Sequence, residues 1–169
     1  MVRKTGEMSE WPEVPQFGAL LREHIGSVPD EARPAFLSGL ERSAAARYRQ
    51  WAEVLPQYAD DLLACADSED EIARLIAEQF PVSDKLQAQV DAALPAAVQL
   101  YYDVFAPHPP MHQLYLQSEA ELQGAMAWVH MAEVVDDPDT LEVLQRCTEL
   151  ERQSSVVVKR LLDDATTPA

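Results

Sequence analysis

The sequence is poor in cysteine and contains no long apolar run. Two cysteines among 169 residues are too few for a disulfide framework. No stretch reaches the roughly 18 apolar residues that a membrane-spanning helix needs. The first residues, MVRKTGEMSEWPEVP, include basic side chains but no apolar core behind them, so they do not resemble a secretory signal. These absences predict a cytoplasmic protein that does not enter a membrane.

Basic residues are scarce as well. The chain has 13 Lys and Arg against 29 Asp and Glu, which gives a formal net charge of −16. A surface of this charge repels the phosphates of nucleic acids and of anionic lipids, so neither is expected as a partner. The same charge attracts cations, although an acidic surface that only keeps the protein soluble has a similar composition. The charge therefore excludes two classes of partner and leaves cation binding open.

Glycine is limited to five residues, and no segment alternates apolar and polar residues for long, so β-strands are not expected. The remaining pattern is typical of helices. Ser83 is expected to cap the helix that follows it, and Pro95 to kink or break that helix. The predicted helices span residues 15–26, 31–55, 57–80, 82–106, 111–135 and 139–163.

These helices predict an all-α fold. Four of them have apolar stripes suited to a bundle, while 15–26 would be a leader helix and 82–106 a connecting or covering helix. One helical-bundle domain is expected over residues 14–164, between an N-terminal tail at 1–13 and a C-terminal tail at 165–169. A chain of this length can bury a sizeable core.

An internal repeat runs through the bundle helices. The segment ERSAAARYRQWAEVL (41–55) aligns with ELQGAMAWVHMAEVV (121–135) at an offset of 80 residues. Residues 60–80 align with 142–162 at an offset of 82, with leucine, cysteine and glutamate at matching positions. Two consecutive helices that repeat in the same order indicate a duplicated helical hairpin.

Each bundle helix carries a glutamate in the middle of its apolar stripe. Glu69, for example, shares a helix face with Cys65 and Ile72, because spacings of three and four residues lie on one side of a helix. A packed bundle would therefore point these carboxylates into its centre. A buried carboxylate takes up a proton, pairs with a cation or binds a metal. The pattern predicts a carboxylate-bridged metal site formed by Glu41, Glu69, Glu121 and Glu151.

The order of these glutamates resembles the ferritin-like superfamily. A glutamate is followed about 28 residues later by a second one, and the same pair returns after a long gap. The resemblance covers roughly residues 31–163. It implies a four-helix bundle of two antiparallel hairpins, with 82–106 as the crossover. It also implies that Glu41 and Glu121 are the single glutamates of a di-iron type of site, with Tyr48 as a tyrosine near it.

The sequence departs from the family in its Glu-x-x-His motifs. The histidine positions after Glu69 and Glu151 hold Ile72 and Ser154, and no Glu-x-x-His occurs anywhere in the chain. Four carboxylates alone could hold a hard ion such as Mn²⁺, Mg²⁺ or iron. Sulfur ligands could be added by two residues one turn earlier, Cys65 and Cys147.

Two functions therefore stay open. The first is a metal-binding protein of the non-haem oxidoreductase type, with iron or manganese between the four glutamates. The second is a non-catalytic acidic module for binding or assembly, in which the carboxylates are protonated or paired with arginine and the cysteines pack as core residues. Either protein could associate into a homodimer through helix faces. The arginines considered for this pairing are Arg42, Arg74 and Arg152.

Overall fold

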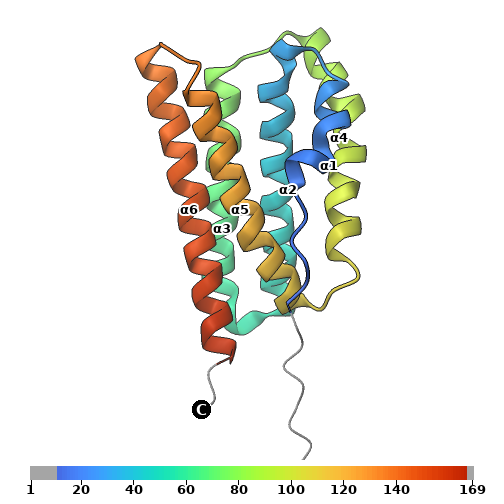
Figure 1. Cartoon of the computed structure of the whole chain (residues 1–169), viewed down its shortest axis with the longest axis vertical. Helices are drawn as coiled ribbons and strands as arrows, with labels where there is room; N and C mark the ends of the chain where they lie inside the picture. Colours follow the sequence, from blue (N-terminus) through green and yellow to red (C-terminus); the bar gives the residue numbers. More distant parts are fainter. Residues whose placement is uncertain (1–10, 167–169) are drawn as a thin grey trace, which may run out of the picture.

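The structure, a computed structural model, describes residues 11–166. Over this range it contains six α-helices, two short 3-10 turns and no β-strand (Figure 1). Each α-helix matches a predicted one to within three residues at either end, so the all-α prediction is confirmed. The helices are α1 (Phe17–Gly26), α2 (Arg33–Val54), α3 (Ala59–Gln79), α4 (Asp84–Phe105), α5 (Pro110–Ala132) and α6 (Pro138–Thr166).

Four of the helices form two hairpins. A turn that includes Pro56–Tyr58 reverses the chain between α2 and α3, and residues 133–137 reverse it between α5 and α6 (Figure 1). α2 packs along α3, and α5 packs along α6. α3 also lies against α6, which joins the two hairpins (Figure 1). The two halves of the sequence repeat occupy these two hairpins.

α4 connects the hairpins and packs on α2, on the side away from α6 (Figure 1). Ser83 caps it as predicted, since its Oγ accepts a hydrogen bond from the backbone N–H of Leu86 at 3.4 Å. The helix runs on past the exposed Pro95, so a break at this residue is wrong. Gly39 of α2 permits the close approach of α4, because a Cβ there would lie 2.5 Å from Cδ2 of Leu94.

α1 bridges α4 and α5. The ring of Phe17 stacks on Tyr101 of α4 with centroids 5.1 Å apart. Gln123 of α5 holds the start of the helix: its Oε1 accepts from the N–H of Phe17 at 2.8 Å, and its Nε2 donates to the carbonyl of Pro15 at 2.9 Å. Leu21 is buried in the apolar cluster shared with α2 and α4. α1 thus crosses one face of the bundle and is held there by contacts with α4 and with α5.

The predicted tails lie partly outside the described residues. Of the segment 1–13, residues 1–10 are outside, whereas Trp11 stacks on Tyr115 of α5 with centroids 4.9 Å apart. Of the segment 165–169, residues 167–169 are outside, and α6 ends at Thr166. None of the described helices is both long and apolar enough to cross a membrane.

Candidate metal centre

Four glutamates, one from each hairpin helix, face one another inside the protein. Glu41 lies on α2, Glu69 on α3, Glu121 on α5 and Glu151 on α6. One carboxylate oxygen from each of Glu41, Glu69 and Glu151 lies within 4.8 Å of the other two. Glu121 is close enough for its charge to raise the pKa of Glu41 and of Glu69. We call these four residues the glutamate cluster.

The cluster is almost sealed from water. Glu69 is 0% exposed, and Glu121 and Glu151 are each 2% exposed. Glu41 is partly exposed, so an ion or a small molecule can reach the cluster from solvent past this residue. Charged side chains are rarely buried to this degree without a partner of opposite charge.

Glu121 is held by two hydrogen bonds to the same oxygen. Its Oε1 accepts from the hydroxyl of Tyr48 on α2 and from Nε2 of Gln117 on its own helix, both at 2.6 Å. Tyr48 is itself 0% exposed. Donors placed in this way fix the orientation of a carboxylate.

The other two fully enclosed carboxylates have fewer donors. Nε1 of Trp128 donates to Oε1 of Glu151 at 2.9 Å, and Oγ of Ser154 donates to Oε1 of Glu69 at 3.1 Å. Oε2 of Glu69 is buried and has no hydrogen-bond partner. An oxygen of this kind is destabilising unless a proton or a cation occupies its lone pairs.

Burial and mutual repulsion raise the pKa values of the cluster. Burial, followed by the charge of Glu121, raises the pKa of Glu41 from 4.5 to about 8. The same two causes raise the pKa of Glu69 well above 4.5. Burial and then the charge of Glu41 raise the pKa of Glu151 well above 4.5. At neutral pH the cluster therefore retains protons, which a divalent cation would displace on binding.

One buried arginine lies beside the cluster. Arg47 of α2 is 4% exposed, and its charge lowers the pKa of one cluster glutamate. It forms no ion pair with a carboxylate in the part of the chain that the structure describes. Of the arginines considered from the sequence, Arg74 pairs with Glu78 at 2.8 Å, whereas Arg42 and Arg152 are exposed. One cation thus faces four acidic groups.

The two cysteines stay apart from the group of clustered oxygens. Among the described residues, the set of ligand atoms close enough to share an ion contains no sulfur. Sγ of Cys65 lies 4.0 Å from the carbonyl oxygen of Ser154. Burial raises the pKa of Cys65 and of Cys147 to about 12, which disfavours the thiolate form that binds metals. Both pack in apolar clusters.

The two positions at which the ferritin-like pattern would place histidine hold Ile72 and Ser154. Ile72 is fully buried in the apolar cluster that contains Ile76 and Trp128. Ser154 supports the carboxylate of Glu69. The ligand atoms that the structure brings together are therefore carboxylate oxygens, which suit hard cations such as Mn²⁺, Mg²⁺ and Fe²⁺.

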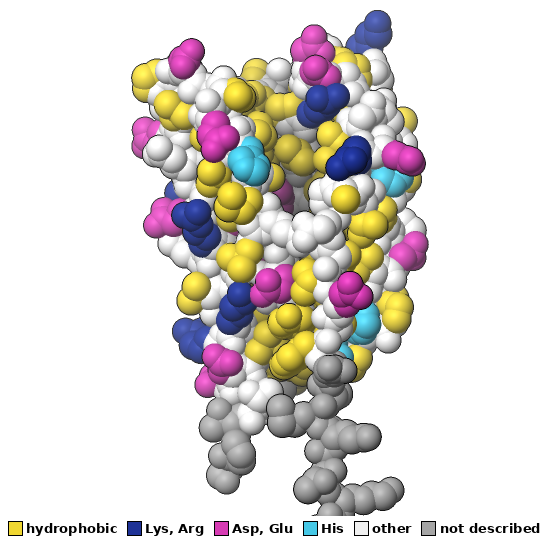
Figure 2. Space-filling view, in the orientation of Figure 1, with side chains coloured by type: hydrophobic (Ala, Val, Ile, Leu, Met, Phe, Trp, Pro, Cys, Tyr) yellow, Lys and Arg dark blue, Asp and Glu magenta, His cyan; other side chains and the backbone are white. Residues whose placement is uncertain are grey.

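A cavity leads to the cluster from the face that α1 crosses. It has a volume of about 140 Å³ and lies between α1, α2 and α5. Glu41, Glu121 and Glu151 line its polar end, while leucines such as Leu21 and Leu40 line the remainder. Figure 2 shows this face hollowed between α5 and α1. A small molecule in the cavity would lie directly against the carboxylates.

Several residues of the centre were not predicted, among them Arg47, Gln117, Gly124 and Trp128, which donates to Glu151. Arg47 Nη2 donates to Oε1 of Gln117 at 3.3 Å, which connects the arginine to Glu121. Gly124 makes room for Glu151, since a Cβ there would lie 2.6 Å from its Oε1. Gln117 and Gly124 lie four residues before and three after Glu121, so a search along that helix face could have found them. No comparable pattern in the sequence points to Arg47.

Replacing Tyr48 with phenylalanine is expected to lower the free energy of unfolding by about 1–3 kcal/mol, because a buried carboxylate loses one of its two donors. Urea unfolding at fixed pH measures the change. Tyr58→Phe is the matched control, since Tyr58 is only partly buried and packs at the edge of the core. Equal loss in both variants would contradict a role for the Tyr48 hydroxyl in holding Glu121.

Comparison with known proteins finds no family model, no curated protein and no solved structure that matches this chain. The geometry of the cluster is therefore the basis for assigning a function.

Proposed function

We propose that this chain is a metal-binding protein of ferritin-like architecture that holds iron or manganese between its buried glutamates. The proposal depends chiefly on one observation: oxygens of Glu41, Glu69 and Glu151, from three helices, lie within 4.8 Å of one another. Hard divalent cations contact oxygen ligands at roughly 2.0–2.6 Å. An ion between three such oxygens can therefore contact all of them with small side-chain movements.

The helix arrangement supports the ferritin-like part of the proposal. Two hairpins, α2–α3 and α5–α6, each supply two of the four glutamates, and α4 provides the long connection between them. In bundles of this type, metal ligands project inward from facing helices. The match between hairpin order and glutamate order is what we would expect of a divergent member that has lost its histidines.

Each residue of the centre has a role in this proposal. Glu41, Glu69 and Glu151 would bind the ion, and Glu121 would complete the ligand set from the position in which Gln117 and other donors hold it. The unpartnered Oε2 of Glu69 is a lone-pair donor already stripped of water. A bound iron or manganese ion would supply redox or Lewis-acid chemistry. The cavity of about 140 Å³ would hold the second reactant.

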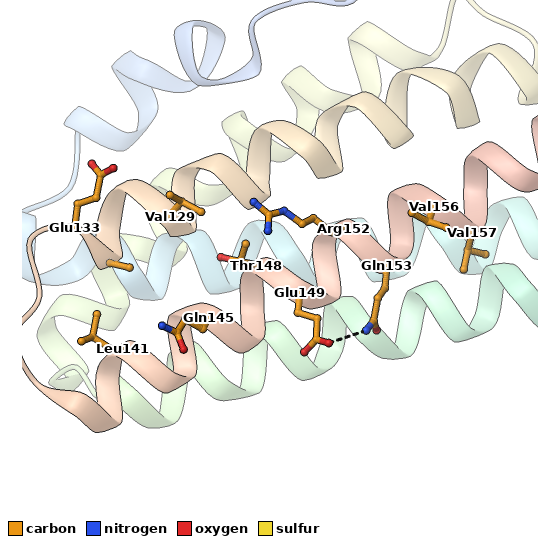
Figure 3. Close-up of a pocket in the computed structure, with 11 residues that line it drawn as sticks. Val129, Glu133, Leu141, Gln145, Thr148, Glu149, Arg152, Gln153, Val156 and Val157 are labelled. Carbon is orange, nitrogen blue, oxygen red and sulfur yellow. Dashed lines mark hydrogen bonds between the residues drawn. The ribbon is translucent and has the colours of Figure 1, made fainter.

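A second candidate function, a helical binding module, is favoured by a different surface. A groove of about 1010 Å³ runs along α5 and α6 on the outside of the bundle, and Figure 3 shows the side chains that line it. Val129, Leu141 and Val156 give it an apolar floor, while Glu149 and Arg152 supply charges of both signs. A module of this kind would need no ion at the glutamate cluster.

The metal content of the purified protein tests the first function. We would incubate the metal-free chain with Mn²⁺, or with Fe²⁺ under anaerobic conditions, remove unbound ion by desalting, and measure metal by mass spectrometry. The wild type is expected to retain about one or two equivalents. Glu69→Gln/Glu151→Gln is expected to retain almost none, because the amide is neutral and leaves shape and packing nearly unchanged.

The control removes two carboxylates from the surface of the same helices. Glu71→Gln/Glu149→Gln changes net charge by the same amount, and both side chains instead contact Arg146 outside the cluster. It should retain metal like the wild type. A glutamate-bound ion would be ruled out if both double variants retain metal, or if none of the three proteins retains it. Either result would favour the binding module.

A further inference from the structure

Arg47 is buried with most of its hydrogen-bonding capacity unused. It is 4% exposed, yet it forms no ion pair among the described residues. A guanidinium has five N–H donors. Nη1 donates to Oγ of Ser43 at 2.9 Å and Nη2 to Oε1 of Gln117 at 3.3 Å, while Nε has no partner. The glutamate cluster lies beside this cation but no described carboxylate accepts a hydrogen bond from it, so its remaining N–H groups are open to an acceptor.

Two aromatic rings of α4 lie against this guanidinium. Its central carbon lies 4.8 Å from the ring centroid of Tyr101 and 5.2 Å from that of Phe105. Cation–π contacts of this kind hold the charge while leaving the N–H edge available to a planar acceptor. Arg47 is therefore preorganised, which lowers the entropy lost when a ligand binds.

A second opening in the surface leads to Arg47, which also lines the cavity of the glutamate cluster. The opening has a volume of about 240 Å³ and lies between α2, α4 and the start of α5. Gln50, Trp51, Tyr102 and Phe105 contribute to its wall, and its lining includes no Asp or Glu. A pocket without acidic side chains and with a buried arginine stands out in a chain of net charge −16.

The wall of this opening also offers a neutral donor and an apolar surface. The hydroxyl of Tyr102 accepts a hydrogen bond from Nε2 of Gln50 at 3.3 Å, which leaves its own O–H to donate. The indole N–H of Trp51 is already used by Gln113 at 2.7 Å, so the indole contributes packing. Cavities of roughly 150 Å³ hold a benzene ring, so a ring with one small substituent fits here.

We propose that this opening is a binding site for a small organic carboxylate with a flat apolar body. The carboxylate accepts hydrogen bonds from Arg47 and from the Tyr102 hydroxyl, and the body packs on Trp51 and Phe105. One cation matches a single negative charge, and the planar guanidinium matches a carboxylate. The proposed ligand occupies a different opening from the glutamate cluster, although Arg47 also lines the cavity of that cluster and is joined to Glu121 through Gln117.

Calorimetric titration of the metal-free full chain with benzoate tests this proposal, with benzyl alcohol and benzylammonium as probes of the same size. Benzoate is expected to bind at one site, benzyl alcohol about tenfold or more weakly, and benzylammonium not measurably. Arg47→Gln should abolish benzoate binding, and Tyr102→Phe should weaken it several-fold. Glu69→Gln/Glu151→Gln should leave it unchanged, because the metal site is not involved.

Circular dichroism establishes which variants are folded. If Arg47→Gln fails to fold, Tyr102→Phe decides, because that hydroxyl lies at the edge of the opening and outside the core clusters. Absence of saturable benzoate binding would overturn the proposal. So would equal binding of benzoate and benzyl alcohol, or unchanged affinity in the folded variant.

Discussion

The metal-free protein is expected to lose stability as the pH rises from about 5 to about 8. In the folded state the pKa of Glu41 is about 8 against 4.5 for the free side chain, and the pKa values of Glu69 and Glu151 are raised as well. Between the pKa of the free side chain and the raised folded-state values, the folded state binds more protons than the unfolded state. The free energy of unfolding therefore falls with rising pH across this window, and the loss is complete above the folded-state values.

The expected loss is on the order of a few kcal/mol, because a tenfold change in proton affinity corresponds to about 1.4 kcal/mol. Urea unfolding at pH 5, 6, 7 and 8 in the presence of a chelator measures it. Adding Mn²⁺ at pH 8 should restore stability, since the ion binds the folded, ionised cluster and not the unfolded chain.

Two double variants separate the buried cluster from general surface repulsion. Glu69→Gln/Glu151→Gln should show a flatter pH dependence, because the amides do not ionise, and should gain nothing from Mn²⁺. Glu71→Gln/Glu149→Gln should follow the wild type. A slope that is the same in all three proteins would mean that the cluster does not govern the pH dependence.

Replacing Gly124 with alanine is expected to weaken metal binding roughly 10- to 100-fold, as is typical when a residue that positions a ligand is changed. The new Cβ would lie 2.6 Å from Oε1 and 2.9 Å from Cδ of Glu151, so the carboxylate has to move. Trp128 now holds that carboxylate at 2.9 Å, and the movement would strain or break this hydrogen bond. The ligand would be displaced while the helix itself tolerates alanine well.

Gly18→Ala is the matched control for this substitution. Nothing lies within 4 Å of a Cβ built at Gly18, which is also helical. It should leave metal binding unchanged and raise the free energy of unfolding by up to about 1 kcal/mol. Competition with a metal indicator measures affinity in each variant. If Gly124→Ala binds metal as tightly as Gly18→Ala, then Glu151 is not a ligand.

Helix positions and the inward direction of the glutamates could be derived from local pattern. Helices are stabilised by contacts between residues three and four positions apart, and these are visible in the order of residues. The stripe that contains Glu69 and Ile72 therefore predicts both α3 and the burial of a carboxylate. The cap at Ser83 can also be predicted from the sequence, because its hydrogen bond involves only the next three residues.

Only the tertiary structure decided how the helix faces pack against one another. Burial of Arg47 beneath Tyr101, the reach of Tyr48 to Glu121, and the cavity under α1 depend on contacts across more than 50 residues of sequence. Such contacts are set by side-chain packing between helices whose mutual orientation no local spacing encodes. The choice among protonated, arginine-paired and metal-binding carboxylates rests on these distances, because electrostatic energies depend on separation and burial, and a helical stripe fixes neither between two different helices.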